Sequence, residues 1–255
     1  MIYHQPHNSK GNYNYNFVSY KDTVYQPHFH RNLEFILCLC GKVSVTVSGK
    51  SRVLLPKQAA LVLSNQIHSF EVSGNAQIWV VVFGEDYVPK FCSMLKGRQG
   101  ETAFFTLSEP IFDMVKKCLI DSDGGLLLRK GCFYAICDDY LKNVTLVQVK
   151  KKNDFIVGQM LDEIAEHYSE NISLKTLAEK FGYEYHYLSR LLNKGYGINF
   201  NQLLNSYRVE AAAELLQTTD LTVTEIAEKS GFQSIRNFNL VFKQIIGQTP
   251  AEMRK

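Results

Sequence analysis

Three residues in the first quarter of the chain have side chains that could bind a metal ion or a polar small molecule. His28, His30 and Glu34 lie at even spacings in a region where polar and apolar residues alternate. Even spacings on a β-strand place side chains on one face, so two imidazoles and a carboxylate should point the same way. Such groups suit a divalent metal, a pocket for an organic effector, or polar packing within a barrel.

A second pattern occurs twice near the C-terminus. Leu177–Tyr183 recurs as Ile226–Phe232, and another helical pattern follows each copy. An amphipathic helix, a glycine at the bend and a second helix predict a helix-turn-helix. A single copy would be weak evidence for this motif, because many helical hairpins have a similar sequence pattern. Two copies joined by one long helix favour a DNA-binding domain.

The charge pattern of this region also suits DNA, although its total charge does not. Residues 150–255 contain thirteen basic and thirteen acidic residues, and the whole chain has a formal net charge of +3. No acidic residue occurs from Tyr185 to Arg208 or from Lys229 to Ala251. These two strips can contact phosphates without making the domain broadly basic. Their basic residues include Arg190, Lys194, Arg208, Lys229, Arg236 and Lys243.

The elements that must position these residues follow from hydrophobic periodicity. From Asn16 to Phe83 the period is two, which predicts short strands without intervening helices and hence a small barrel or sandwich. After Pro89 the period becomes helical, and two antiparallel helices are expected there, either as a dimer interface or packed on the barrel. Lys150–Asp154 is the expected linker.

Seven helices are expected in the C-terminal domain. The fold class is therefore α+β with two domains: residues 1–103 form a β-barrel, residues 104–149 a helical dimerisation or linker region, and residues 150–255 an all-α domain. The first six expected helices are Phe155–Tyr168, Ser173–Phe181, Tyr185–Lys194, Phe200–Gln217, Thr222–Ser230 and Ile235–Ile246, and a short one follows.

The C-terminal domain resembles the AraC/XylS family of bacterial transcription regulators. The resemblance rests on the two repeated turns, on Tyr207–Ala212 of the joining helix, and on Gly231-Phe232 with Gly247–Pro250. It implies that two recognition helices enter successive major grooves of double-stranded DNA, about 34 Å apart. Leu240 stands where the family commonly has a basic or polar residue, so the second helix should read bases less strongly.

The same resemblance assigns roles to exposed positions of the two recognition helices. The base-reading positions of the family fall on His186, Ser189, Arg190, Ile235, Arg236 and Asn239. Asn193 and Lys243 are expected to lie beside them on the DNA-facing side. Ser173 and Thr222, at helix N-termini, are expected to direct backbone N–H groups to phosphates.

The N-terminal region resembles cupin barrels. His28–Glu34 followed by Gly41 matches their first motif, and His68 occupies the place of the histidine in the second. Ser64-Asn65 departs from the second motif. The expected effector pocket contains His28, His30, Glu34 and His68 with Arg31, Trp79 and Tyr25, and suits a sugar or an aromatic acid. The alternative is a divalent metal on His28, His30, Glu34 and His68; otherwise no cofactor is expected.

Together these features predict a cytoplasmic, effector-responsive transcription regulator that is not an enzyme. No signal peptide or membrane span is expected, because apolar runs are only strand-sized. The six cysteines are expected to be buried reduced thiols. A homodimer is expected, with RNA polymerase as a further partner. The alternatives are a metal-dependent cupin enzyme fused to a DNA-binding module, and a DNA-binding protein that needs no effector.

Overall fold

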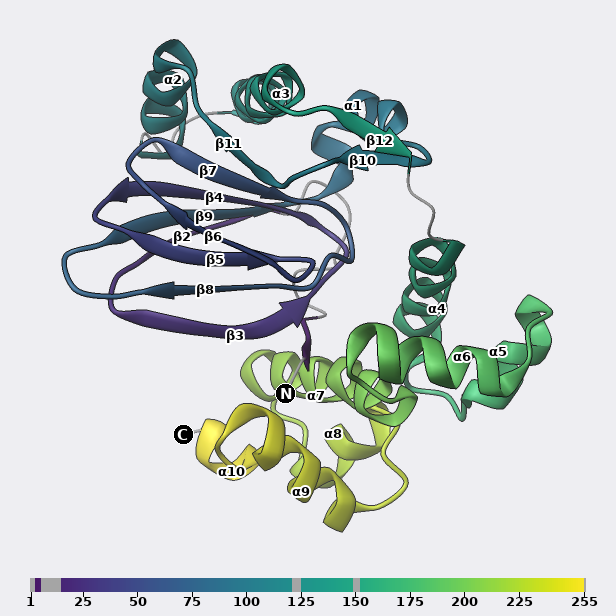
Figure 1. Ribbon diagram of the computed structural model, residues 1–255. Helices are drawn as coiled ribbons and strands as arrows, with labels where there is room; N and C mark the ends of the chain where they lie inside the picture. The colour runs from purple at the N-terminus through teal and green to yellow at the C-terminus, as the bar shows by residue number, and fades with distance from the viewer. Residues whose placement is uncertain (1–2, 6–14, 121–124, 149–151, 255) are drawn as a thin grey trace. The chain divides into compact units, whose positions relative to one another are not determined.

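The chain forms two compact units, Asn8–Lys151, and Lys152–Lys255 together with Met1–His7. The computed structural model describes residues 3–5, 15–120, 125–148 and 152–254 (Figure 1). Within these ranges, every helix is too short or too polar to cross a bilayer. The predicted linker starts outside the described residues, but helix α4 (Lys152–His167) already includes its last three residues.

The first unit contains two antiparallel sheets, which confirms the prediction of a strand-rich N-terminal domain. One sheet holds β3, β8, β5 and β6 in that order, and the other holds β11, β7, β4, β9 and β2. Their strands are β2 (Tyr15–Tyr20), β3 (Thr23–Phe29), β4 (Leu33–Cys40), β5 (Val43–Val47), β6 (Lys50–Leu54), β7 (Gln58–Val62), β8 (His68–Val72), β9 (Gln77–Phe83) and β11 (Phe104–Thr106).

Strand β4 is buried on both faces. Ile36 and Cys38 face the core enclosed between the two sheets, whereas Phe35 and Leu37 belong to a second core outside the barrel. Strand β9 is divided in the same way, since Phe35 pairs with Val81 and Ile36 with Val80. The second sheet therefore separates two apolar compartments.

Helices cover the outer face of this second sheet (Figure 1). The principal ones are α2 (Glu109–Ile120) and α3 (Leu126–Asn143), and Phe133 of α3 stacks on Phe83 of β9 with ring centroids 4.3 Å apart. The described residues therefore place these helices on the barrel. Shorter elements complete the unit: η2 (Glu85–Tyr87), α1 (Pro89–Met94), β10 (Arg98–Gly100) and β12 (Leu146–Gln148).

The helical unit contains two helix-turn-helix motifs joined by one long helix, α7, as predicted (Figure 1). Thr222 and Glu225 form a capping box at the start of α8, and Thr249 and Glu252 form one at the start of α10. The helices after α4 are α5 (Leu174–Phe181), α6 (Tyr185–Arg190), η3 (Leu191–Tyr196), α7 (Phe200–Thr218), α8 (Val223–Lys229), α9 (Ile235–Ile246) and α10 (Pro250–Met253).

The third predicted helix differs in one respect. Its second half, η3, is a π-helical turn that continues directly from α6 and ends at Gly197. Gly197 adopts a left-handed conformation with φ of 63°, which glycine adopts without the steric penalty of a Cβ. Leu191 and Leu192 in this turn are both buried, and the helix ends at the predicted glycine.

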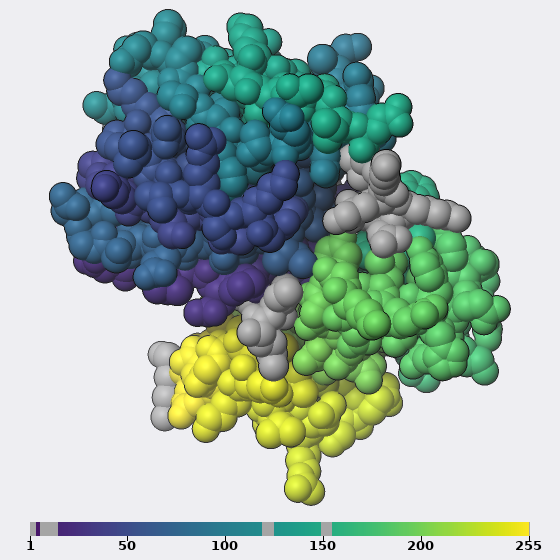
Figure 2. Space-filling view, viewed as in Figure 1, coloured from purple at the N-terminus to yellow at the C-terminus, as the bar shows by residue number. Residues whose placement is uncertain are grey.

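Arg208 of α7 joins the two halves of the helical unit, which pack side by side (Figure 2). Its guanidinium donates hydrogen bonds to the carbonyl oxygens of Tyr168, at 2.8 Å, and Glu170, at 2.9 Å, and lies over the ring of Phe232. Gly231 fits against the same segment, since a Cβ there would come within 2.8 Å of the Tyr168 carbonyl oxygen. Arg208 is thus a structural residue, although the sequence places it in a basic strip.

Substitution Arg208→Ala should therefore affect folding and not phosphate contact. Loss of two hydrogen bonds to carbonyl groups should lower the free energy of unfolding by about 1–3 kcal/mol, measured by urea denaturation of the full chain. The dependence of DNA affinity on salt should stay unchanged. Exposed Lys194 is the matched control: Lys194→Ala should leave stability intact and reduce the salt slope by about 1. Unchanged stability of the Arg208 variant would contradict this role.

Candidate functional sites

The recognition helices α6 and α9 each present one apolar and one polar face. Leu188 in α6, with Phe238 and Phe242 in α9, is fully buried. Phe238 and Phe242 are four positions apart, so they share one side of α9 and leave the opposite side exposed, as Leu188 does for α6. Ring contacts of Phe238 with Phe232 and Phe242 anchor α9 in the core of its motif.

The residues to which the family resemblance assigns base contacts lie on or beside the opposite side. Ser189 is half-buried, and the other five are exposed: His186, Arg190, Ile235, Arg236 and Asn239. Asn193 and Lys243, which were expected beside them, are exposed as well. In α6 these side chains also contact their own helix, since Arg190 Nε donates to the carbonyl oxygen of His186 at 3.3 Å. Leu240 is 69% exposed, which leaves an apolar group on the polar side of α9.

Ser173 and Thr222 cap the first helix of each motif. The Ser173 hydroxyl accepts from the backbone N–H of Thr176, and the Thr222 hydroxyl accepts from that of Glu225. Both residues therefore hold exposed helix N-termini, where the helix dipole favours negative charge. Glu225 already supplies one carboxylate at the second of these ends.

Inside the barrel, four polar groups lie together in an otherwise apolar core. His28 comes from β3, His30 follows it, Glu34 lies on β4 and His68 begins β8. The even spacing places Glu34 on the same face as Ile36, and His28 pairs directly with His68 across β3 and β8. All four side chains are at most 2% exposed, and one candidate ligand atom from each lies within 4.8 Å of the others.

The imidazoles of this cluster are held in defined orientations. Nδ1 of His28 lies 2.9 Å from the Gln26 carbonyl oxygen, that of His30 3.0 Å from Asn32, and that of His68 2.8 Å from Gln66. Burial and the neighbouring His68 lower the pKa of His28 to about 3, and burial lowers the pKa of His30 as well. Burial alone would raise the pKa of Glu34, but His68 and His30 hold it well below its usual value.

The other residues of the predicted effector pocket, Tyr25, Arg31 and Trp79, do not all lie on the same side of the second sheet. The Tyr25 ring lies 4.8 Å from that of His28, beside the cluster. Arg31 is exposed. Trp79 belongs to the core outside the barrel, where Phe17 meets it edge to face at 5.7 Å. Trp79 and the histidines therefore occupy opposite faces of one sheet and do not line a common pocket.

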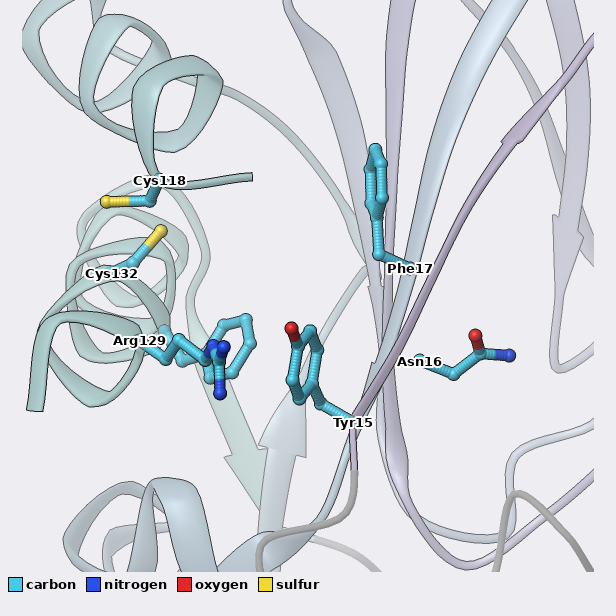
Figure 3. A pocket seen from close by; sticks show the side chains of 7 residues that line it. Tyr15, Asn16, Phe17, Cys118, Arg129 and Cys132 are labelled. Atoms are coloured by element: carbon cyan, nitrogen blue, oxygen red, sulfur yellow. The ribbon is translucent and has the colours of Figure 1, made fainter. Parts of the chain in front are cut away.

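A cavity of about 380 Å³ lies on the helix-facing side of this sheet (Figure 3). The Arg129 guanidinium lies over the Tyr15 ring at 4.5 Å and also hydrogen-bonds Tyr87. Cys118 and Cys132 face each other across α2 and α3, and burial raises the pKa of Cys132. The lining residues are Tyr15, Asn16, Phe17, Cys118, Arg129, Cys132 and Phe133.

No sequence pattern indicates this cavity, because Tyr15 and Arg129 are more than a hundred residues apart. No pattern indicates the role of the first described residues either. Strand β1 (Tyr3–His4) belongs to the helical unit, where the His4 ring stacks on Tyr207 at 4.9 Å and its Nδ1 lies 3.4 Å from Ser206 Oγ. His4 and Gln5 are both 3% exposed.

Comparison with known proteins agrees with this architecture. A family model described as AraC-like ligand binding domain matches residues 15–119, and one described as helix-turn-helix domain matches residues 177–255. An uncharacterized HTH-type transcriptional regulator of Staphylococcus aureus strain COL is 38% identical over 102 residues, which are 40% of this chain and 14% of that protein. The HTH-type transcriptional activator RhaS of Enterobacter sp. strain 638 is 30% identical over 115 residues, 45% of this chain and 41% of its own length.

Solved structures with a similar fold include ToxT from Vibrio cholerae. One has a TM-score of 0.62 with 13% identity, covering 95% of this chain and 97% of ToxT. Another, with unsaturated fatty acid bound, has a TM-score of 0.59 with 14% identity, covering 96% of each chain. At this identity the likeness concerns the fold alone. An AraC-like ligand binding domain followed by a double helix-turn-helix places this chain in the AraC family.

Proposed function

We propose that the protein is a transcription regulator that binds double-stranded DNA through α6 and α9 and responds to a small molecule bound by its N-terminal domain. The observation that carries this proposal is the pair of helix-turn-helix motifs with buried apolar and exposed polar faces. Such helices suit the major groove, where Arg and Asn side chains can read guanine and adenine. A cytoplasmic protein without enzymatic activity fits this role, with RNA polymerase as a partner.

The base contacts can be tested with fragments of the neighbouring genomic DNA. Arg190→Ala and Arg236→Ala should each reduce specific affinity by about 1–3 kcal/mol, because each removes a side chain able to make bidentate contacts to a guanine. Affinity would be measured by fluorescence anisotropy at two salt concentrations. Arg52→Ala, in exposed strand β6, is the control and should change nothing. Equal binding of all fragments by the wild-type protein would contradict sequence-specific recognition.

The cavity between β2 and helices α2 and α3 suits an organic effector better than the predicted pocket around His28, His30, Glu34 and His68. It has free volume, an apolar wall that includes Phe17 and Phe133, and one cationic group, Arg129. This combination suits a molecule with an apolar body and a carboxylate, because a guanidinium binds carboxylates with two parallel hydrogen bonds. The fatty acid bound by ToxT has that chemistry, which supports the choice. The effector would act through residues 1–20 or through the helices that border the cavity.

A cis-unsaturated fatty acid is a suitable probe of this cavity. Arg129→Gln should weaken its binding by roughly 10–150-fold, since a hydrogen bond to a charged group contributes about 1.5–3 kcal/mol. Calorimetry would give the affinity, and anisotropy would show whether the probe changes DNA binding. The methyl ester, which has no charge, should bind both proteins equally. Equal binding of the acid by both proteins would exclude Arg129, and unaltered DNA binding would exclude the acid as effector.

Helix α3 also offers a surface for the homodimer. Leu126, Leu127 and Leu128 begin the helix and are 40%, 83% and 52% exposed, an apolar group that a partner could cover. We expect Leu127→Asp to shift the protein from dimer to monomer in sedimentation equilibrium, because burying a carboxylate at the interface is costly. Val24→Asp, another exposed apolar position, should leave the dimer intact. A monomeric wild-type protein would refute this assignment.

A further inference from the structure

Two cysteines form a pair at the wall of the cavity. Cys118 on α2 and Cys132 on α3 face each other, and their side chains are in hydrogen-bonding contact (Figure 3). Both line the cavity, where Cys118 is half-buried and Cys132 is buried. Because the two thiols come from different helices, the packing of α2 against α3 is what brings them together. DNA binding through α6 and α9 makes no use of this pair.

The other four cysteines are placed differently. On β4, the Cys38 thiol contacts the carbonyl oxygen of Cys40, and the Cys40 thiol that of Asn75. Burial raises the pKa of Cys92 to about 12, and burial with the neighbouring Cys92 raises the pKa of Cys137 well above its usual value. Oxidants react with the thiolate and not with the thiol, so Cys92 and Cys137 are poor targets.

The cavity admits a small oxidant to one member of the pair. Its volume of about 380 Å³ is many times the roughly 30 Å³ that a water molecule occupies, which leaves room for hydrogen peroxide beside the half-buried Cys118. Burial, with the neighbouring Cys118, raises the pKa of Cys132, so this thiol stays protonated. Cys118 is therefore the thiol that reacts first, and Cys132 is the one within reach of the product.

We propose that Cys118 and Cys132 are a site of reversible oxidation, where a hydroperoxide converts the two thiols into a disulfide that ties α2 to α3. The Cys118 thiolate attacks one peroxide oxygen and becomes a sulfenic acid, while the other oxygen leaves as hydroxide and takes up the Cys118 proton to form water. The Cys132 sulfur then displaces the sulfenic hydroxyl, which takes up the Cys132 proton and leaves as a second water.

The overall reaction is balanced and can be reversed. Two thiols and one hydrogen peroxide give one disulfide and two water molecules. A dithiol reductant restores both thiols and is itself oxidised to a disulfide. A disulfide holds its sulfur atoms at about 2.05 Å, so oxidation fixes the spacing of α2 and α3 at the cavity wall. It should also raise the melting temperature of the first unit by several degrees, because it constrains the unfolded chain.

Peptide mapping tests the pairing directly. The reduced full-length protein would be treated with one equivalent of hydrogen peroxide per chain and digested without reductant. Chymotrypsin cleaves after Phe133 and Tyr134, which separates Cys132 from Cys137. We expect one linked pair of peptides, Cys118 with Cys132, lighter by two hydrogen atoms than the separate peptides. Thiols counted in the unfolded protein should fall from six to four, and a dithiol should restore all six.

Serine variants test the order of the two steps. In Cys132→Ser the Cys118 sulfenic acid has no partner, so dimedone, which reacts with sulfenic acids, should label Cys118. In Cys118→Ser dimedone should label neither position of the pair. Serine is close to cysteine in size, and circular dichroism would confirm that each variant folds. Cys40→Ser is the matched control, because Cys40 is the exposed cysteine, and this variant should form the same disulfide as the wild-type protein.

Other results would overturn the proposal. A link between Cys92 and Cys137, or equal loss of thiols in Cys118→Ser and the wild-type protein, would place the reactive thiols elsewhere. An unchanged melting temperature after oxidation would mean that the bond strains the two helices, and that the native fold does not hold the thiols ready to react. The reaction needs neither DNA nor an effector, so its failure is distinct from failure of the proposed regulator function.

Discussion

The period-two alternation of strands β4 and β9 is the constraint on which the N-terminal domain depends. Because successive side chains point to opposite faces, Glu34 and Ile36 enter the barrel while Phe35 and Leu37 support the helices. One sheet thus builds two chemically different compartments, a polar cluster within apolar walls and a cavity beneath helices. A shift of one residue in register would exchange them, so the buried pairing of β4 with β9 determines both sites.

In the helical unit the corresponding constraint is the set of directions in which successive side chains of α7 point. Consecutive helical residues point about 100° apart, and three neighbours on α7 contact three segments of the unit. Ser206 and the Tyr207 ring contact His4, the Tyr207 hydroxyl donates to the Leu161 carbonyl oxygen of α4 at 3.3 Å, and Arg208 reaches the segment after α4. Residues 3–5 and both helix-turn-helix motifs therefore depend on one turn of one helix.

Local sequence patterns predicted the helix starts and the strand faces of this structure. Strand pairing and contacts between distant segments determined the features that the patterns could not predict. Capping residues such as Thr222 and Thr249 mark helix starts through contacts three residues away, so they can be read directly. The shared face of His28, His30 and Glu34 follows from spacing in the same way. The position of Trp79 does not, because it depends on which β4 residue it opposes, and that is Leu37. The prediction that Arg208 contacts phosphate was wrong, because a basic residue near a recognition motif can equally donate hydrogen bonds to backbone carbonyl groups.

The barrel cluster is also difficult to explain as a device for stability. A buried carboxylate loses most of its solvation, and ion pairs in such sites are often no more stabilising than hydrophobic residues of equal volume. The surrounding positions show that the fold accepts aliphatic groups here, since Ile36, Val72 and Val82 fill the same core. Four adjacent polar residues, each imidazole fixed by a backbone carbonyl, therefore maintain an arrangement that costs folding free energy, so their presence in this core points to a role other than stability.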